Sequence, residues 1–307
     1  MLLDIQRMSS EDGPGLRTTA FLKGCPLACA WCHNPESISR KGEVLWHSSR
    51  CIGCVSCIQV CPQKGIELTS ERLSIAHERC LGCFSCAQAC PTRAIEAKGT
   101  PIEATALARE LLKDRAYFDR DGGITLSGGE ALLQAESIEL LRILKEAQVE
   151  VAVDTCGLIS VERLAAALEL ADIVLYDLKL ADDEQHKRWT GVGNGQILTN
   201  LALVADWAAR KGRLWIRTPI IPGATDSDDN IRGLAEIIGR LPTGPSVVER
   251  WELCAFNNLG ASKYESIERA WEFESVALMT QTRMQELVSL AHQHVDITDI
   301  HATGAMT

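Results

Sequence analysis

The sequence lacks any long apolar run. No stretch approaches the roughly 18 consecutive apolar residues of a membrane-spanning helix, and Asp4 and Arg7 interrupt the start, where an export signal needs an apolar segment. Positive charge is also scarce, because 31 lysines and arginines face 41 aspartates and glutamates, a net charge of −10. General nucleic-acid binding needs clustered cations. We therefore expect a cytoplasmic chain with neither a membrane nor nucleic acid as its partner.

Cysteine, in contrast, is abundant. The 307 residues include 13 cysteines, and eleven of them fall between Cys25 and Cys90 at short, regular spacings. In a chain without an export signal such cysteines face a reducing compartment, where they ligate metals rather than form disulfides. The other two, Cys156 and Cys254, lie in apolar segments typical of strands.

The rest of the sequence alternates between strand-like and helix-like segments. The predicted strands are 18–24, 123–127, 149–155, 172–178, 213–221 and 249–256. Apolar residues at three- and four-residue intervals predict helices over 103–117, 135–147, 160–170, 198–211, 228–240 and 276–294. This alternation is typical of βα units around a parallel sheet, and six units favour a partial barrel. Chemistry in such folds lies at the carboxyl ends of the strands.

An internal repeat interrupts this pattern. The run from Cys51 to Pro62 recurs 29 residues later, from Cys80 to Pro91. Its spacing, CxxCxxCxxxCP, is that of bacterial two-cluster ferredoxins, in which the fourth cysteine of each run ligates the other cluster. We expect one [4Fe–4S] cluster on Cys51, Cys54, Cys57 and Cys90, and a second on Cys80, Cys83, Cys86 and Cys61. The expected domains are an insert over 46–99 and a barrel formed by 1–45 and 100–307. A zinc ribbon, the alternative, would leave surplus thiols.

Two motifs follow the first two predicted strands. Cys25-Pro-Leu-Ala-Cys29-Ala-Trp31-Cys32 offers three thiolates, which can hold three irons of a [4Fe–4S] cluster and leave the fourth iron open to a ligand. The alternative is a structural zinc site with His33 as the fourth ligand. In the second motif, Ser127-Gly128-Gly129-Glu130, glycines allow a ligand to approach the backbone and the carboxylate can receive an ammonium group. The alternative there is a tight turn with an exposed glutamate.

Taken together, these motifs resemble the glycyl radical enzyme activating enzymes of the radical S-adenosylmethionine (SAM) superfamily, in the form that carries a two-cluster ferredoxin insert. The resemblance also rests on the opening motif Asp12-Gly-Pro-Gly-Leu-Arg17 and on segments 154–157, 177–179 and 215–217. It implies an α/β fold, namely a partial (β/α)6 radical SAM barrel with an inserted bacterial ferredoxin-like domain that holds two [4Fe–4S] clusters. The implied cofactors are three [4Fe–4S] clusters, SAM and a monovalent cation.

The resemblance assigns roles to single residues. Cys25, Cys29 and Cys32 would hold the catalytic cluster, and Asp12 would lie near the incoming glycine loop of the partner. The contacts it implies with SAM and its cation are Trp31, Ser127, Gly128, Gly129, Glu130, Asp154, Asp177, Lys179, Arg217 and Asn257. Ala131 replaces the proline usual in the family, and Asn257 the histidine of some members. The alternative is that the charged residues have only structural roles, in which the aspartates cap helices and the lysine and arginine side chains cover the open end of the barrel.

The implied reaction is the reductive cleavage of SAM to a 5′-deoxyadenosyl radical, which abstracts a glycine Cα hydrogen from a partner enzyme. This is an oxidoreductase activity. The expected partners are a large glycyl radical enzyme and a low-potential reductant such as flavodoxin or ferredoxin, and we expect the chain to be a monomer. Two alternatives stay open: a radical SAM enzyme that acts on a small molecule or peptide, and an electron-transfer ferredoxin with a long appendage. An open iron argues against the latter, since a carrier has no use for it.

Overall fold

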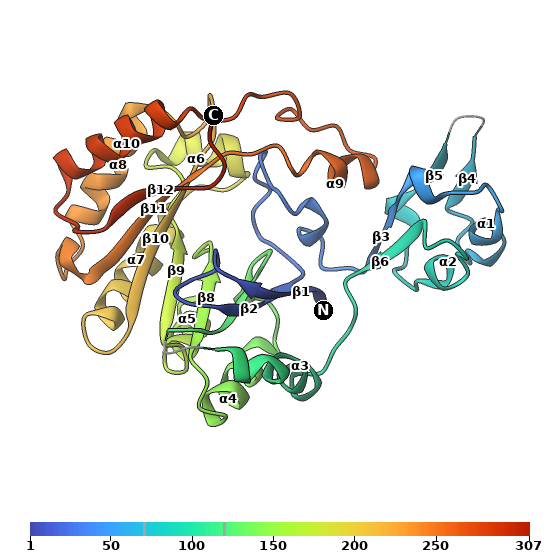
Figure 1. Cartoon of the computed structure of the whole chain (residues 1–307), viewed down its shortest axis with the longest axis horizontal. Coiled ribbons are helices and arrows are strands. Elements are labelled where there is room, and N and C mark those ends of the chain that lie inside the picture. The colour runs from blue at the N-terminus through green and yellow to red at the C-terminus, as the bar shows by residue number, and fades with distance from the viewer. Residues whose placement is uncertain (70–71, 119–120) are drawn as a thin grey trace.

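The computed structural model describes residues 1–69, 72–118 and 121–307, and its centre is a curved eight-stranded sheet (Figure 1). The strand order is β1-β2-β7-β8-β9-β10-β11-β12, so β1 and β12 form the two edges and the barrel is open. β1 is antiparallel to β2, whereas all other neighbours in this sheet are parallel. The bounds are β1 Leu2–Ser9, β2 Arg17–Leu22, β7 Gly123–Gly128, β8 Val151–Thr155, β9 Ile173–Asp177, β10 Arg213–Ile220, β11 Val248–Ala255 and β12 Ile300–Thr303.

Helices cover the outside of this sheet, as Figure 1 shows for α3, α4, α5, α7, α8 and α10. The helices outside the cysteine-rich repeat are α3 Ala104–Leu111, α4 Ser137–Glu146, α5 Val161–Leu168, α6 Asp183–Thr190, α7 Gly195–Ala208, α8 Asp228–Gly239, α9 Ala261–Ser266 and α10 Gln281–His294. Among the residues that the structure describes, no helix combines the length and the apolar character needed to cross a bilayer.

All six predicted strands and all six predicted helices are confirmed, with some shifts at their ends. α10 begins at Gln281 rather than at 276, because the Thr280 side chain accepts a hydrogen bond from the Arg283 backbone N–H and so caps the helix there. The sequence pattern did not predict β1, β12, α6 or α9. β1 is largely exposed and β12 has only four residues, while α6 is too polar to show an apolar period.

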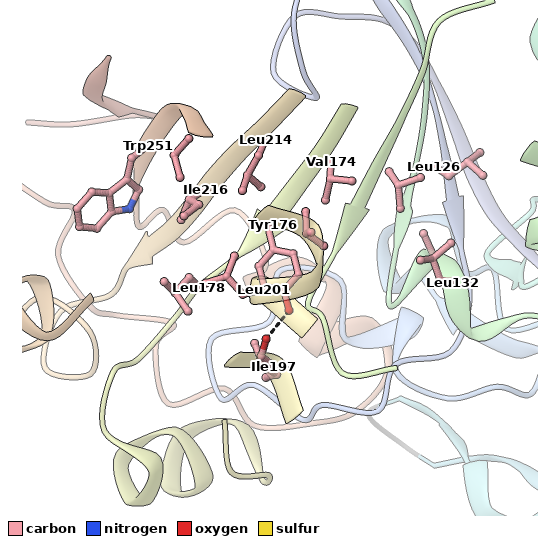
Figure 2. Close-up of a cluster of buried hydrophobic side chains, with 14 of the residues drawn as sticks. Leu126, Leu132, Val174, Tyr176, Leu178, Ile197, Leu201, Leu214, Ile216 and Trp251 are labelled. Carbon is pink, nitrogen blue, oxygen red and sulfur yellow. Dashed lines mark hydrogen bonds between the residues drawn. The ribbon is translucent and has the colours of Figure 1, made fainter. Parts of the chain in front are cut away.

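The parallel strands are buried on both faces. Toward the helices, Val174, Tyr176, Leu214 and Ile216 belong to the main hydrophobic core (Figure 2). The Tyr176 hydroxyl donates a 2.6 Å hydrogen bond to the Ile197 carbonyl and thereby ties β9 to α7. On the opposite face, a second small cluster contains Ala152, Ile173, Leu175 and Trp215. This two-sided burial explains why these strands are continuous apolar runs in the sequence.

The cysteine-rich repeat forms a separate small unit beyond one side of the sheet (Figure 1). Its elements are β3 Glu43–Trp46, α1 Ser56–Val60, β4 Ile66–Leu68, β5 Leu73–Ile75, α2 Ser85–Gln88 and β6 Ile95–Lys98. The strands of the two halves pair crosswise, β3 with β6 and β4 with β5. Its core is distinct from the main core and includes Val44, Ile66, Leu73 and Ile95.

The repeat is also visible in the backbone. Positive φ angles recur at matching positions of the two halves: 67° and 66° at Gly53 and Gly82, and 55° and 62° at Val55 and Phe84. Left-handed backbone is uncommon for valine and phenylalanine. Both halves therefore follow the same path around their cysteines, as the 29-residue repeat in the sequence predicts.

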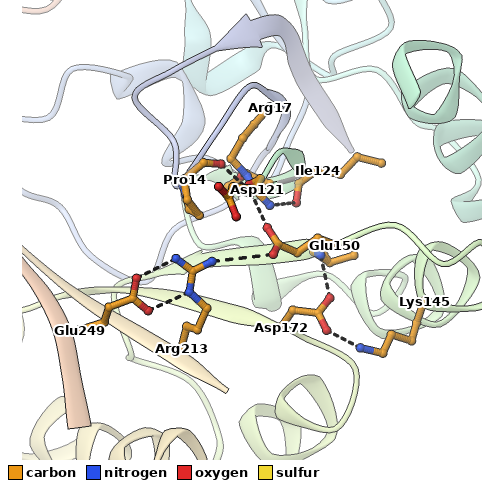
Figure 3. A network of polar contacts seen from close by, with 11 residues as sticks. Pro14, Arg17, Asp121, Ile124, Lys145, Glu150, Asp172, Arg213 and Glu249 are labelled. Carbon is orange, nitrogen blue, oxygen red and sulfur yellow. Dashed lines mark hydrogen bonds and ion pairs between the residues drawn. The ribbon is translucent and has the colours of Figure 1, made fainter. Parts of the chain in front are cut away.

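A polar network closes the amino-terminal side of the parallel sheet (Figure 3). The fully buried Arg17 guanidinium donates to the Thr125 hydroxyl at 2.7 Å, to the Glu150 carboxylate at 2.9 Å and to three backbone carbonyls. Arg213 joins this network through a 3.8 Å ion pair with Glu150, and its two 2.7 Å bonds to Glu249 extend it to β11. The network thus links β2, β7, β8, β10 and β11 at the end away from the carboxyl termini of the strands.

We expect Arg17→Met to lower the free energy of unfolding by about 3–5 kcal/mol, because it leaves the buried partners of a hydrogen-bonded ion pair unsatisfied. Arg142→Met is the matched control. Arg142 lies on the exposed face of α4 and pairs with Glu139 and Glu146, and exposed pairs contribute about 0–1 kcal/mol. Urea unfolding followed by circular dichroism measures both. Equal losses in the two variants would contradict a structural role for the network.

Candidate active site

A cavity of about 380 Å³ opens at the carboxyl ends of the parallel strands. Eleven of the residues expected from the sequence line it: Cys25, Cys29, Trp31, Cys32, Gly128, Gly129, Asp154, Asp177, Lys179, Arg217 and Asn257. They come from the ends of β2, β7, β8, β9, β10 and β11 or from the loops that follow. The position agrees with the general rule that parallel α/β folds bind ligands at this edge.

The CxxxCxxC loop is held on both sides by backbone hydrogen bonds. The Cys25 N–H donates to the Ile38 carbonyl at 3.0 Å, while the Ala28 and Ala30 N–H groups donate to the carbonyls of Thr190 and Trp189 at the end of α6. Cys25, Cys29 and Cys32 thereby open onto one cavity. Burial raises the pKa of Cys29 to about 12 and that of Cys32 to about 11. Ligation of iron would displace these protons, since thiolates are the ligands.

The three thiols fit an iron–sulfur cluster better than a single metal ion. In the described ranges, no three histidine, cysteine, aspartate or glutamate side chains converge on one ion-sized position. His33, the fourth ligand of the zinc alternative, directs its Nε2 atom to the Asn257 carbonyl at 2.8 Å and packs against Phe256 and Trp271. It is therefore occupied by packing and hydrogen bonding. Three thiols spread around an open cavity suit a cluster with one vacant iron.

Two ion pairs lie in the wall of the cavity. The Lys179 ammonium lies 2.5 Å from the Asp177 carboxylate, and Arg217 lies 3.6 Å from Asp154. Burial alone would lower the pKa of Lys179, but Asp177 and Cys29 raise it overall, so the side chain stays charged. Burial raises the pKa of Asp154 to about 7 against the opposing effect of Arg217. The cavity thus offers fixed groups of both signs to a zwitterionic ligand.

Ser127, Glu130 and Asp12 do not line this cavity. Ser127 supports it from behind, since its hydroxyl donates to the Asp154 carboxylate at 2.6 Å. The Asp12 carboxylate accepts hydrogen bonds from Ser9 at 2.6 Å and Thr19 at 2.7 Å, so it fixes the loop between β1 and β2. Its neighbour Glu11 faces the cavity instead.

Glu130 is fully buried beneath the turn. Its carboxylate accepts hydrogen bonds from the Leu132 N–H at 3.0 Å, from the Thr155 hydroxyl at 2.9 and 3.0 Å and from the Cys156 N–H at 2.9 Å. Direct contact between this carboxylate and a ligand ammonium does not fit that placement. Gly128 and Gly129 are the parts of the motif that line the cavity, and they present backbone to it.

Sequence reasoning missed several residues of the cavity wall. Cys156 and Cys254 line it, although the sequence shows them only as members of apolar strands. Glu252 lies behind it, 7% exposed, with its carboxylate 3.4 Å from Arg217 Nε. The available signal was a charged residue flanked by Trp251 and Leu253 in β11, which also contains Glu249 and Arg250.

The small cysteine-rich unit contains two further cavities, each lined by four cysteines. One, the Cys51 cavity, is lined by Cys51, Cys54, Cys57 and Cys90. The other, the Cys80 cavity, is lined by Cys80, Cys83, Cys86 and Cys61. In each, three cysteines come from one repeat and the fourth from the other. The fourth sulfur also accepts a backbone hydrogen bond, from Gly65 to Cys61 at 3.4 Å and from Ala94 to Cys90 at 3.2 Å.

The sequence of this chain is similar to those of known proteins. A family profile described as a 4Fe-4S single cluster domain matches residues 11–198. The trans-4-hydroxy-L-proline dehydratase activating enzyme of Clostridioides difficile is 36% identical over 94% of this chain and 95% of its own length. The isethionate sulfite-lyase activating enzyme of Oleidesulfovibrio alaskensis is 37% identical over 94% of each.

A solved structure shares the fold. The crystal structure of a radical SAM methyltransferase from Sphaerobacter thermophilus superimposes with a TM-score of 0.54 at 16% identity, covering 98% of this chain and 69% of that one. This likeness concerns the architecture alone. The two activating enzymes match nearly end to end and at well over 30% identity. The chain therefore belongs to the family of glycyl radical enzyme activating enzymes, which are radical SAM enzymes.

Proposed function

We propose that this activating enzyme holds three [4Fe–4S] clusters, one on Cys25, Cys29 and Cys32 and two in a ferredoxin-like insert over 46–99. The barrel domain then comprises 1–45 and 100–307. The proposal rests on how the cysteines of the insert are grouped around its two cavities. Each of its two cavities combines three cysteines of one repeat with the fourth of the other, which is the exchange of ligands that two-cluster ferredoxins use.

The barrel cavity is the proposed SAM site. A cluster held there by Cys25, Cys29 and Cys32 would supply the electron for the reductive cleavage of SAM, and the 5′-deoxyadenosyl radical would then remove the glycine Cα hydrogen. The protein's own task is to bind, orient and exclude water. We assign the methionyl ammonium to the backbone at Gly128 and Gly129, because these glycines line the cavity where Glu130 does not. The methionyl carboxylate then faces the cations Lys179 and Arg217.

Other contacts complete the proposed site. Trp31 lines the cavity and is 5% exposed, so its ring offers a flat apolar surface to the adenine. Asn257 and the pair Asp154 and Asp177 supply oxygen atoms, the two carboxylates also being the proposed contacts of a monovalent cation. Glu11 and Asp12 lie in the loop between β1 and β2, where the partner's glycine loop would enter. We place the enzyme in the cytoplasm, because its 13 cysteines are all free thiols and cluster assembly needs reducing conditions. We also propose that it acts as a monomer.

The proposed protein partner is a large enzyme that receives the radical on a backbone glycine, with a low-potential flavodoxin or ferredoxin as reductant. A cavity that opens at the carboxyl ends of the strands of an open barrel suits a flexible peptide segment. Since the target glycine lies inside a folded partner, its loop must first become accessible. Activation should therefore be slow and should depend on the conformation of the partner.

The reconstituted chain should contain about twelve irons, because three clusters of four are each supported by a set of cysteines. Replacing Cys25, Cys29 and Cys32 together by alanine should leave about eight irons, since the insert keeps its own ligands. Iron and sulfide analysis of anaerobically reconstituted protein measures both. One cluster per chain, or stoichiometric zinc, would contradict the proposal.

Glu130→Gln should destabilise the fold while leaving SAM affinity nearly unchanged. The carboxylate of Glu130 now accepts hydrogen bonds from one hydroxyl and two backbone N–H groups, and the N–H₂ group of a glutamine would face one or more of these donors without being able to accept. Hydrogen bonds to charged groups contribute about 1.5–3 kcal/mol each. Urea unfolding and equilibrium binding of SAM to the reconstituted variant separate the two effects. A loss of SAM affinity of tenfold or more, on the order of one charge-assisted hydrogen bond, without loss of stability would show that the carboxylate itself holds the ligand.

Radical transfer can be observed directly. Reduced enzyme, SAM and a candidate partner should give an electron paramagnetic resonance doublet from a glycyl radical. The doublet should vanish when the partner's glycine is replaced by alanine, and also with the triple cysteine-to-alanine variant of this chain. Efficient 5′-deoxyadenosine formation on a small molecule, without any protein radical, would contradict radical transfer to a protein.

A further inference from the structure

The two halves of the insert have the same sequence pattern but different surroundings. Gly82 lies so close to the segment before β3 that a Cβ atom there would be 2.6 Å from the Gly42 carbonyl oxygen. A Cβ on Gly42 would in turn lie 2.5 Å from the Phe84 ring. The matching glycine of the first repeat, Gly53, has no other atom within 4 Å of such a Cβ. The second repeat is thus packed against the connection to the barrel, and the first faces outward.

Other contacts place the Cys80 cavity on the barrel side. Ile75 lines that cavity, and its backbone N–H donates to the Glu268 carboxylate, just after α9, at 3.1 Å. Lys23, at the end of β2, forms a 2.7 Å bond to Glu43 at the start of β3. The neighbouring Val44 also lines the Cys80 cavity. The Cys51 cavity is therefore the outer of the two.

The outer cavity carries an exposed apolar rim. Ile52, Val55 and Leu68 line it and are 67%, 37% and 44% exposed. In the second repeat, Phe84 takes the place of Val55 and is half-buried against Gly42. Large apolar side chains gathered on a surface mark an interaction site more often than isolated ones do. The rim is small, as expected for the brief encounters of electron-transfer proteins.

Charge identifies the kind of partner. Residues 46–99 contain six lysines and arginines against four glutamates, so this segment carries two net positive charges and the rest of the chain twelve net negative ones. Arg50 precedes Cys51, and Arg93 lies between two residues that line the Cys51 cavity. Both are exposed, and neither forms an ion pair with another described residue. An acidic protein would be attracted to this face and repelled by the barrel.

We propose that the face formed by Arg50, Ile52, Val55, Leu68 and Arg93 is the docking surface for an acidic, low-potential electron-transfer protein. The inference rests on the proposed clusters of the insert. One electron leaves the reduced flavin or iron–sulfur centre of the donor and enters the cluster held by the four cysteines of the Cys51 cavity. No covalent bond forms or breaks. The four cysteines of the Cys80 cavity then lie between this entry point and the barrel.

The repeat supplies a matched pair of variants. Ile52→Glu places a negative charge on the proposed face, whereas Leu81→Glu does so at the equivalent position of the other repeat, which is 65% exposed. The probe is a purified acidic flavodoxin in its hydroquinone form, mixed anaerobically with the reconstituted enzyme, and the bleaching of the iron–sulfur absorbance is followed. We expect Ile52→Glu to slow this reduction about tenfold and Leu81→Glu to change it less than about twofold. Reduction by dithionite should be alike in all three proteins.

Salt provides an independent measure. Reduction of the wild-type enzyme by flavodoxin should slow as ionic strength rises, and Arg50→Glu should weaken that dependence, because steering between opposite charges is screened. Wild-type rates in Ile52→Glu, or equal losses in Ile52→Glu and Leu81→Glu, would overturn the docking surface. The proposal would also be overturned if Ile52→Glu were still reduced by flavodoxin at the wild-type rate but no longer bound the glycyl radical enzyme, or no longer bound a second copy of this chain. Failure of the proposed clusters is distinguishable, since it is seen in the iron content before flavodoxin is added.

Discussion

The close approach of two strand-end turns, at Gly24 and Gly129, is the constraint on which the active site depends. The Gly24 carbonyl accepts a 2.8 Å hydrogen bond from the Glu130 N–H, and the Gly129 N–H donates to the Leu22 carbonyl at 2.9 Å. A Cβ on Gly129 would lie 2.4 Å from the Gly24 oxygen, so the contact requires glycine. It holds the start of the cysteine loop against the turn after β7. The two motifs that are about a hundred residues apart in the chain thereby share one cavity.

The same constraint explains the burial of Glu130. With the backbone of the turn pressed against Gly24, the side chain points below it, where Thr155 and the backbone of Cys156 satisfy it. The carboxylate thereby joins the turn after β7 to the end of β8. A buried carboxylate without such donors would be costly. The motif therefore has two different parts: glycines that line the cavity and a glutamate that fixes their position.

The sequence alone predicted those features that depend on the spacing of residues along the chain. Cysteine intervals predicted which four thiols share each insert cavity, and the order of apolar segments predicted the parallel sheet. Spacing does not determine which way a strand-end side chain points. Glu130 and Asp12 were consequently expected to face a ligand or partner, whereas each is used by hydroxyl or amide donors within the fold. Glu252 was missed because a charged residue within a strand does not by itself show its partner, which here is Arg217 on the neighbouring strand.

The insert shows how a duplicated sequence acquires unequal surroundings while its cysteine spacing stays the same. Both repeats provide the same cysteine spacing and the same left-handed turns. The two halves differ in their packing, because the Phe84 ring lies against Gly42 whereas its counterpart Val55 is 37% exposed. Asymmetric packing of equivalent positions thus gives the insert one side that lies against the barrel connection and one side that does not.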